Sequence, residues 1–445
     1  MREDNRFLQR VKRYGHVGMS AGKMATTFAG QRLKSSDIFT QTAAQELRKA
    51  LGGLKGPIMK VAQIMATIPD ALPEEFAKEL SQLQCDAPPM GWPFVKRRMN
   101  KELGANWQQR FKQFDRDSSY AASLGQVHQA RSLEGEKLVC KLQYPDMSSA
   151  IEADLNQLKL MFSIYRRYDK AIDTTNILAE LSERLREELD YTREAKSMQI
   201  YGEMLSGEEN IHVPTPIQGL STDRLLTMTY LPGNPLIETA EKSPEICNTI
   251  ATSLFKAWYI PLYRYGIIHG DPHLGNYTVR EDGSVNLLDF GCIRFFKADF
   301  VSGIIDLYNA IRTNDKDKAI HAYESWGFEN LSHDIIDILN RWAHYIYTPL
   351  LEDKTRHIHD SDNGLYGAKV ANEIHQELKE RGGIRPPREF VMVDRAAIGL
   401  GSVFMRTRAE VNWHRLFHEL IDDFNAETLT ANQKQLLDKV DLTLT

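Results

Sequence analysis

Cysteine is scarce in this sequence. The four cysteines, at positions 85, 140, 247 and 292, are far apart in a chain of 445 residues. A disulfide-stapled domain needs closely spaced cysteines, and the commonest zinc sites need a C-x-x-C pair; neither pattern occurs. We therefore expect a reducing, cytoplasmic environment and no structural metal held by cysteine.

Long apolar runs are also missing. The best candidates are broken by charge, as at 158–165, which contains Lys159 and is followed by Arg166. A membrane-spanning helix needs about 20 consecutive apolar residues, so none is expected. The first six residues, Met-Arg-Glu-Asp-Asn-Arg, lack the apolar core of a secretory signal. These absences predict a soluble protein.

The chain has no excess of basic residues. Its 55 Lys and Arg face 60 Asp and Glu, a formal net charge of -5, so nucleic acid is not an expected partner. Locally the balance reverses, because residues 1–34 contain eight basic side chains and two acidic ones. This basic arm has two interpretations: peripheral attachment to the anionic inner face of a membrane, or a solvated terminal segment.

Local patterns predict an α+β fold with segregated β and helical parts. The runs 124–131 and 137–144 are rich in β-formers and are joined through Glu134-Gly135, as in an antiparallel hairpin. Strand character returns at 225–230, and the turn Asp282-Gly283 predicts a second hairpin. Helical spacing dominates 151–189 and 298–445.

These patterns give four predicted regions. They are a basic N-terminal arm at 1–50, a helical extension at 51–112, a small β-containing lobe with a helical insert at 113–231, and a helical lobe at 232–445.

One loop carries a strong chemical signal. The segment His269-Gly-Asp271-Pro-His-Leu-Gly-Asn276 spaces an aspartate and an asparagine by five residues, and Asp289-Phe-Gly follows across the second predicted hairpin. Protein kinases use this order and spacing. Asn276 and Asp289 would then bind Mg²⁺, while Asp271 would accept a proton from the attacking hydroxyl or water.

The two histidines of this loop offer an alternative. His269 and His273 are four residues apart and could suggest a metal site. Pro272 lies between them and argues against a helical pair that faces one ion. We expect instead that His269 packs behind the loop.

A strand lysine lies upstream of the loop. Lys141, within Leu138-Val-Cys-Lys-Leu-Gln, resembles the kinase lysine that binds the α- and β-phosphates of ATP. The segment before it contains Ala121, Ala122 and Ser123, where ordinary kinases have a glycine-rich loop. These three residues are therefore expected beside the nucleotide phosphates, with alanine Cβ atoms restricting the approach.

Together these motifs resemble the UbiB/AarF-type atypical kinase-like family. The resemblance covers most of the chain, and its most specific segments are Ala-Ala-Ser-Leu-Gly-Gln-Val-His at 121–128 and Glu-Leu-Asp-Tyr-Thr-Arg-Glu-Ala at 188–195. It implies a two-lobed protein-kinase-like fold with a helical N-terminal extension, ATP or ADP and Mg²⁺ as ligands, and a link to ubiquinone or lipid metabolism.

The resemblance also implies roles for acidic residues and for the extension. It favours Glu194 as the partner of Lys141, but Glu188 stays open as the alternative. Glu188 and Asp190 would then meet the extension, in which Lys60 and Gln63 correspond to the family's K-x-G-Q motif. Ala62 stands where that motif has glycine. His-Gly-Asp at 269–271 likewise replaces the more frequent His-Ala-Asp.

We therefore expect a Mg²⁺-dependent ATPase of the atypical kinase type that binds an adenine nucleotide and handles a lipid or quinone intermediate. Two alternatives use the same residues: a phosphotransferase acting on a small molecule or a protein, and a nucleotide-gated binding module without turnover.

Overall fold

The computed structural model describes residues 90–442 except 123, 153–154, 157–158, 160–170, 240–242, 330 and 359–364. Residues 89–445 form one compact unit by their own contacts. The basic arm, the part of the predicted extension before residue 90, which contains Lys60 and Gln63, and Ser123 lie outside the described residues.

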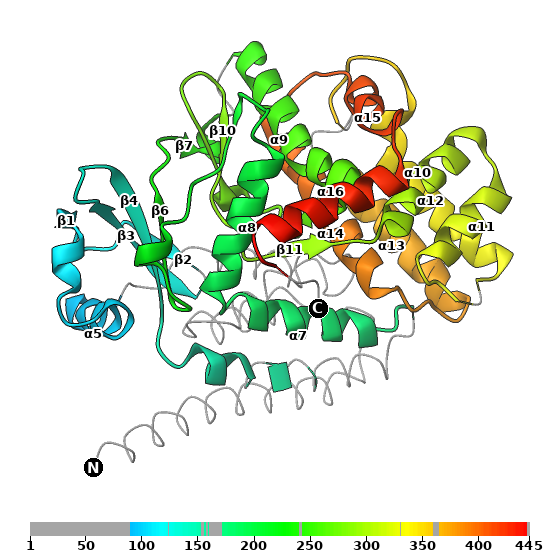
Figure 1. The fold of residues 1–445 in the computed structure, drawn as a ribbon. Helices are drawn as coiled ribbons and strands as arrows, with labels where there is room; N and C mark the ends of the chain where they lie inside the picture. Colours follow the sequence, from blue (N-terminus) through cyan, green and yellow to red (C-terminus); the bar gives the residue numbers. More distant parts are fainter. Residues whose placement is uncertain are drawn as a thin grey trace. The chain divides into compact units, whose positions relative to one another are not determined.

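The unit begins with an antiparallel sheet, drawn in cyan to green in Figure 1. Its strands lie in the order β1-β3-β4-β6, and β2 pairs with β3. The side chains of Leu138, Cys140 and Leu142 alternate toward one buried face of β4, as the period of a strand requires. The strands are β1 (Gln113–Phe114), β2 (Tyr120–Ala122), β3 (Gly125–Arg131), β4 (Lys137–Gln143) and β6 (Leu225–Thr229).

Both predicted hairpins are confirmed. Arg131 of β3 pairs with Lys137 of β4 on either side of the turn at Gly135. Further along, β9 (Tyr277–Val279) and β10 (Val285–Leu287) pair antiparallel around the turn at Gly283. Both turn glycines have positive φ angles, 97° and 86°, which side chains other than glycine rarely adopt.

A helix and a short 3₁₀ turn cover one face of the first sheet. They are α5 (Trp92–Leu103) and η3 (Trp107–Arg110). Val95 and Met99 of α5 are fully buried in a cluster that also contains Trp107, Cys140 and Leu142. The first sheet therefore has its own small core.

The helical segment that follows β4 contains a break that the sequence analysis did not predict. Helix α7 (Thr175–Glu187) ends at Glu188, and α8 (Tyr191–Met204) begins after Asp190. The Asp190 side chain accepts a hydrogen bond from the backbone amide of Arg193 at 3.0 Å, which caps α8. Glu188 thus lies at the end of α7 and Glu194 in the first turn of α8, so the two residues do not share one helix.

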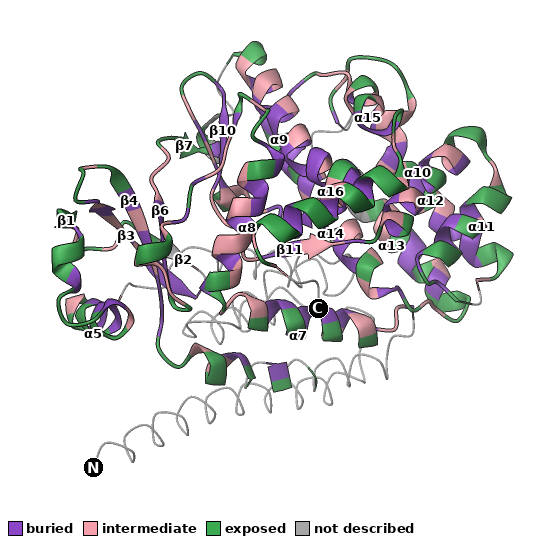
Figure 2. Ribbon diagram, viewed as in Figure 1, coloured by how far each residue is buried: buried purple, intermediate pink, exposed green. Residues whose placement is uncertain are grey.

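The central helix α9 (Pro244–Tyr265) is buried along much of its length, as Figure 2 shows. It ends at Gly266, whose φ of 65° gives the left-handed cap. The next strand, β8 (Ile267–His269), leads into the predicted catalytic loop and pairs antiparallel with β11 (Ile293–Phe295). Asp289-Phe-Gly lies just before β11, so this pairing places the two motifs next to each other.

A second sheet lies beyond the first and joins short strands from distant parts of the chain. Its order is β5-β10-β9-β7, with β5 (Ile211–His212) parallel to β10 and β7 (Asn234–Pro235) antiparallel to β9. The segment 232–235, which follows the predicted boundary between the two lobes, thus ends as an edge strand of this sheet.

The rest of the unit is helical, as predicted. The helices are α10 (Ala298–Thr313), α11 (Lys316–Ser325), α12 (His333–Leu351), α13 (Leu365–Glu380), α14 (Arg388–Thr407), α15 (Trp413–Ile421) and α16 (Ala426–Lys439). No helix among the described residues is long and apolar enough to cross a membrane. The α+β class, a small β region followed by a largely helical one, is confirmed.

Candidate active site

Lys141 meets two carboxylates at the junction of β4, α8 and the Asp-Phe-Gly segment. Its Nζ lies 2.7 Å from Oε1 of Glu194 and 3.2 Å from Oδ2 of Asp289. Lys141 and Glu194 are nearly buried, while the side chain of Asp289 is 32% exposed. We call these three residues the Lys141 cluster. Its open side is therefore the Asp289 side.

The cluster carries one negative charge in excess. Burial lowers the pKa of Lys141, but the carboxylates of Asp289 and Glu194 outweigh that effect and hold it well above its ordinary value. Burial raises the pKa of Glu194 to about 7, although Lys141 opposes the shift. A charged lysine thus faces two acids, and the surplus favours a proton or a cation at the site.

The predicted catalytic loop holds Asp271 and Asn276 together. The Asn276 amide donates to the backbone oxygen of Asp271 at 3.0 Å and to its Oδ2 at 3.2 Å. Asp271 is buried. Asn276 Nδ2 is therefore occupied by Asp271, and the amide oxygen on the other side of the same group is the atom that can bind a metal.

His269 connects this loop to the Asp-Phe-Gly segment. Its Nδ1 accepts a hydrogen bond from the backbone amide of Asp271 at 3.2 Å. That nitrogen must be unprotonated, so Nε2 carries the proton and donates to the backbone oxygen of Asp289 at 2.6 Å. The ring is buried beside Tyr201, Trp258 and Phe290. The prediction that His269 packs behind the loop is confirmed.

The donor atoms fit magnesium better than a softer metal. Asp289 and Asn276 offer carboxylate and amide oxygens, the ligands that Mg²⁺ prefers, with phosphates and water completing its shell. Asp289 keeps its position through a hydrogen bond from the Gly291 amide to Oδ1 at 3.0 Å. Within the described part of the chain, no group of three or more His, Cys, Asp and Glu side chains could hold a metal alone.

The alanine-containing segment forms a tight hairpin. Ala122 at the end of β2 pairs with Gly125 at the start of β3, which leaves a two-residue loop. Gly125 is required there, because a Cβ would lie 2.3 Å from the backbone oxygen of Leu142. The neighbouring Gln126 is buried; its amide accepts from the Met90 amide at 2.8 Å and donates to the Met90 oxygen at 3.1 Å.

Lys141 pairs with Glu194 in this structure. Glu188 lies nearby, since a Cβ on Gly291 would be 3.7 Å from its Cγ. Asp190 is exposed and caps α8. Their predicted contact with Lys60 and Gln63 involves residues outside the described range and stays a prediction.

Helix α14 supports the catalytic loop from behind, which the sequence analysis missed. A Cβ on Gly399 would lie 2.2 Å from Cγ of Pro272, and a Cβ on Gly270 would lie 2.7 Å from Cε of Met392. Close packing thus explains the glycine in His-Gly-Asp. Only the unexpected glycine itself could have signalled this contact.

A second group of charges joins α7, β11 and α14. Glu180 is buried and contacts Arg184 at 3.1 Å, Arg388 at 2.8 Å, and Arg294, five residues beyond Asp289. The Arg184 side chain is only 2% exposed. We call this set the Glu180 cluster; its members are Glu180, Glu183, Arg184, Glu187, Arg193, Arg294 and Arg388.

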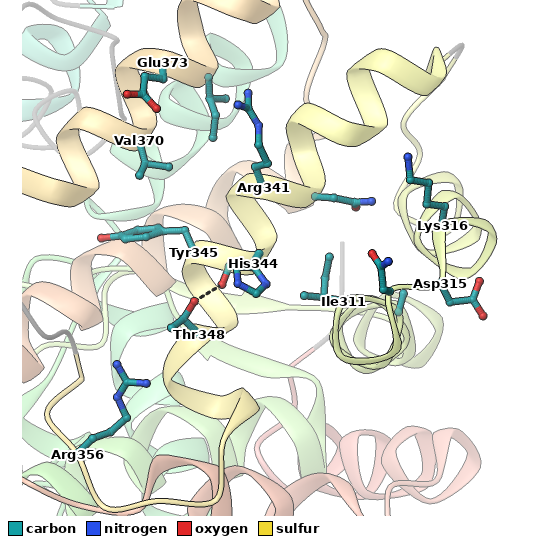
Figure 3. Close-up of a pocket in the computed structure, with 14 residues that line it drawn as sticks. Ile311, Asp315, Lys316, Arg341, His344, Tyr345, Thr348, Arg356, Val370 and Glu373 are labelled. Carbon is teal, nitrogen blue, oxygen red and sulfur yellow. Dashed lines mark hydrogen bonds between the residues drawn. The ribbon is translucent and has the colours of Figure 1, made fainter.

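A groove of about 870 Å³ opens elsewhere, between α10, α12 and α13 (Figure 3). Its lining includes Lys316 and Arg341, which pair with Asp337 at 2.7 Å and Glu377 at 2.6 Å. None of the predicted site residues lines it. We therefore place the candidate active site at the Lys141 cluster and the catalytic loop.

The sequence is similar to those of several known proteins. The mitochondrial atypical kinase COQ8 of Saccharomyces cerevisiae is 25% identical over 432 residues, covering 92% of this chain and 84% of its own. The chloroplastic protein ACTIVITY OF BC1 COMPLEX KINASE 7 of Arabidopsis thaliana is 31% identical over 281 residues, but this chain covers only 40% of it.

A solved structure has the same fold. The erythromycin complex of Rv3197 from Mycobacterium tuberculosis aligns with a TM-score of 0.59 and 26% identity, over 86% of this chain and 96% of the other. The ABC1 atypical kinase-like domain matches residues 82–323, more than half of the sequence. The chain therefore belongs to the ABC1 family of atypical kinase-like proteins, the UbiB/AarF type that its motifs resemble.

Proposed function

We propose that this protein is a Mg²⁺-dependent ATPase. The observation that supports this most directly is the Lys141 cluster, in which Lys141 lies 2.7 Å from Glu194 and 3.2 Å from Asp289. The catalytic loop, in which Asn276 donates a hydrogen bond to Asp271, supplies the remaining groups. Phosphoryl transfer needs a cation on the phosphates, oxygen ligands for a metal and a carboxylate at the acceptor. Each requirement has a residue here.

In the proposed reaction, Lys141 binds phosphate oxygens and the alanine hairpin at Ala121 and Ala122, with Ser123, covers them. Asp271 orients a water molecule and accepts its proton as the water oxygen bonds to the γ-phosphorus. The bond from that phosphorus to the bridging oxygen breaks, and ADP and phosphate result. Asn276 and Asp289 would hold Mg²⁺, which would supply positive charge beside the phosphates.

The physiological role follows the family resemblance. The yeast relative carries the name of an atypical kinase of mitochondria, and the family resemblance links such proteins to ubiquinone and lipid metabolism. We propose a lipid or quinone intermediate as the partner of the hydrolysis cycle. The basic arm, 1–50, would attach the protein to an anionic membrane surface.

The test measures nucleotide binding and ATP turnover of the purified full-length protein with and without Mg²⁺. Asp289→Asn should lower kcat by about 100-fold or more, because it removes a metal ligand. It should also abolish the Mg²⁺ dependence of ATP affinity. Asp299→Asn, an exposed aspartate in the first turn of α10, is the matched control and should behave like wild type.

The proposal fails if the wild-type protein binds no nucleotide in the presence of Mg²⁺. Binding with lobe closure but without phosphate release would favour the non-hydrolysing module. Transfer of labelled phosphate to an added small molecule or protein would favour the phosphotransferase.

A further inference from the structure

Tyr191 lies beside the Lys141 cluster without a role assigned to it above. It is the first residue of α8, directly after the cap at Asp190, and it is 1% exposed. Its ring centroid lies 5.2 Å from Nζ of Lys141, a cation–π distance. The same helix turn therefore presents Glu194 and the Tyr191 ring to one lysine.

The Tyr191 hydroxyl is buried and has no hydrogen-bond partner among the described residues. Buried polar groups without partners are rare in folded proteins and usually have a cause, such as a missing ligand. Tyr144 and Tyr201 share this property, so it is not sufficient alone. Tyr191 differs from both because it contacts the lysine expected to bind phosphate.

The position of the Tyr191 hydroxyl relative to the alanine hairpin indicates where a ligand of this hydroxyl would lie. A Cβ on Gly125 would lie 3.1 Å from the Tyr191 Oη, so this oxygen lies against the start of β3, where Gly125 pairs with Ala122. Tyr191 thus lies between the hairpin expected to cover the phosphates and the lysine expected to bind them.

We propose that the Tyr191 hydroxyl donates a hydrogen bond to a phosphate oxygen of the bound nucleotide. This inference rests on the proposed function and adds a phosphate contact from α8 to it. A phosphate accepts hydrogen bonds and carries negative charge, so it would satisfy the hydroxyl and interact with the neighbouring ammonium at the same time. Burial raises the pKa of Tyr191, so the hydroxyl stays protonated and able to donate.

The presence of Tyr191 and Glu194 in one turn of α8 has a structural consequence. Glu194 on the first turn of α8 holds Lys141, and Tyr191 at the start of the same helix would hold the phosphate. A nucleotide bound in this way would fix the N-terminus of α8 relative to the hairpin.

The test is Tyr191→Phe, which removes only the hydroxyl and keeps the ring over Lys141. Without ligand, the thermal midpoint should stay the same or rise, since an unsatisfied buried group is lost. With Mg²⁺, ATP and ADP affinity should fall roughly tenfold, the effect of a hydrogen bond to a charged group. Adenosine, which has no phosphate, should bind both proteins equally.

Tyr144→Phe is the matched control. Tyr144 also has a buried hydroxyl without a partner among the described residues. It packs against Phe94 of α5, in the hydrophobic cluster between this helix and the first sheet. This variant should keep wild-type affinity for ATP, ADP and adenosine.

Two results would overturn the inference while the proposed function survives. One is wild-type ATP affinity in Tyr191→Phe. The other is an equal loss for adenosine and ATP, which would mean a disturbed pocket instead of a lost phosphate contact. If the wild-type protein itself binds no nucleotide, the proposed function fails first, and the two failures are distinguished.

Discussion

The two charge clusters take glutamates from neighbouring helices, Glu194 from α8 and Glu180 from α7, yet they differ in how far they are open to solvent. The Lys141 cluster has one cation for two acids and an exposed edge at Asp289. The Glu180 cluster has four arginines for three glutamates, and Arg184 and Glu180 at its centre are almost fully buried. The first therefore has a side at which a cation can enter, whereas the centre of the second is closed to solvent.

This difference indicates that the Lys141 cluster takes part in the reaction, whereas the Glu180 cluster stabilises the fold. A charged site that is open to solvent can bind a metal and a nucleotide, because both supply missing interactions. A network whose centre is buried offers a ligand no access but is costly to break, because removing one partner leaves the others buried without it. We therefore expect mutations in the Glu180 cluster to change stability and those in the Lys141 cluster to change ligand and proton binding.

The largest stability effect should come from Glu180→Gln. This change leaves the Arg184, Arg294 and Arg388 guanidinium groups without their shared carboxylate, and the unfolding free energy should fall by about 4 kcal/mol. Urea denaturation measures it. Glu183→Gln is the control: Glu183 contacts Arg184 and Arg388 too, but its side chain is 49% exposed, so the loss should stay below about 1 kcal/mol. Equal losses would contradict the distinction between the clusters.

The next effect concerns pH and Glu194. Its pKa is about 7 in the folded protein against an ordinary 4.5, so the folded state binds a proton more tightly than the unfolded state between these values. The unfolding free energy should therefore fall as pH rises from about 4.5 through about 7, by at most about 3 kcal/mol. Denaturation in EDTA without nucleotide should show this slope.

Glu194→Gln isolates that contribution, because glutamine does not titrate. The difference in unfolding free energy between wild type and variant should change with pH in the direction given above. Parallel pH profiles for the two proteins would show that Glu194 does not bind this proton.

The smallest effect should follow Gly399→Ala, which tests how α14 connects the Glu180 cluster to the catalytic loop. Arg388 at its start belongs to the Glu180 cluster, while Gly399 packs on Pro272 of the catalytic loop. A methyl group placed 2.2 Å from Pro272 must displace the loop, so we expect a loss of about 2 kcal/mol and reduced ATP turnover. Gly207→Ala, with no atom within 4 Å of its Cβ, should leave turnover unchanged.

The parts that sequence predicted well depend on local signals. Both hairpins have alternating strands around a turn that contains glycine, and the spacing of Asp271, Asn276 and Asp289 is set by short segments of chain. The break between α7 and α8 is also encoded locally, since Asp190 is a favourable helix N-cap.

The parts that sequence could not predict depend on distant residues. Glu180 contacts Arg294 and Arg388, which are 114 and 208 positions away. No periodicity relates such residues, because their proximity results from the packing of α7, β11 and α14 as complete elements. The sequence likewise could not show that the Tyr191 hydroxyl has no hydrogen-bond partner among the described residues, because only the folded neighbourhood reveals this.

The bonds made by His269 have a consequence for the kinds of ligand this site accepts. The rigid imidazole ring links the backbone amide of Asp271 to the backbone carbonyl of Asp289 through two hydrogen bonds. The two aspartates cannot separate unless one of these bonds breaks. Some compounds could bind only after the Asp-Phe-Gly segment changes its conformation. Such a change must first break the hydrogen bond between Nε2 of His269 and the Asp289 carbonyl and displace Phe290 from its buried position. We therefore expect the site to bind more tightly those inhibitors that leave the Asp-Phe-Gly segment in the conformation held by His269.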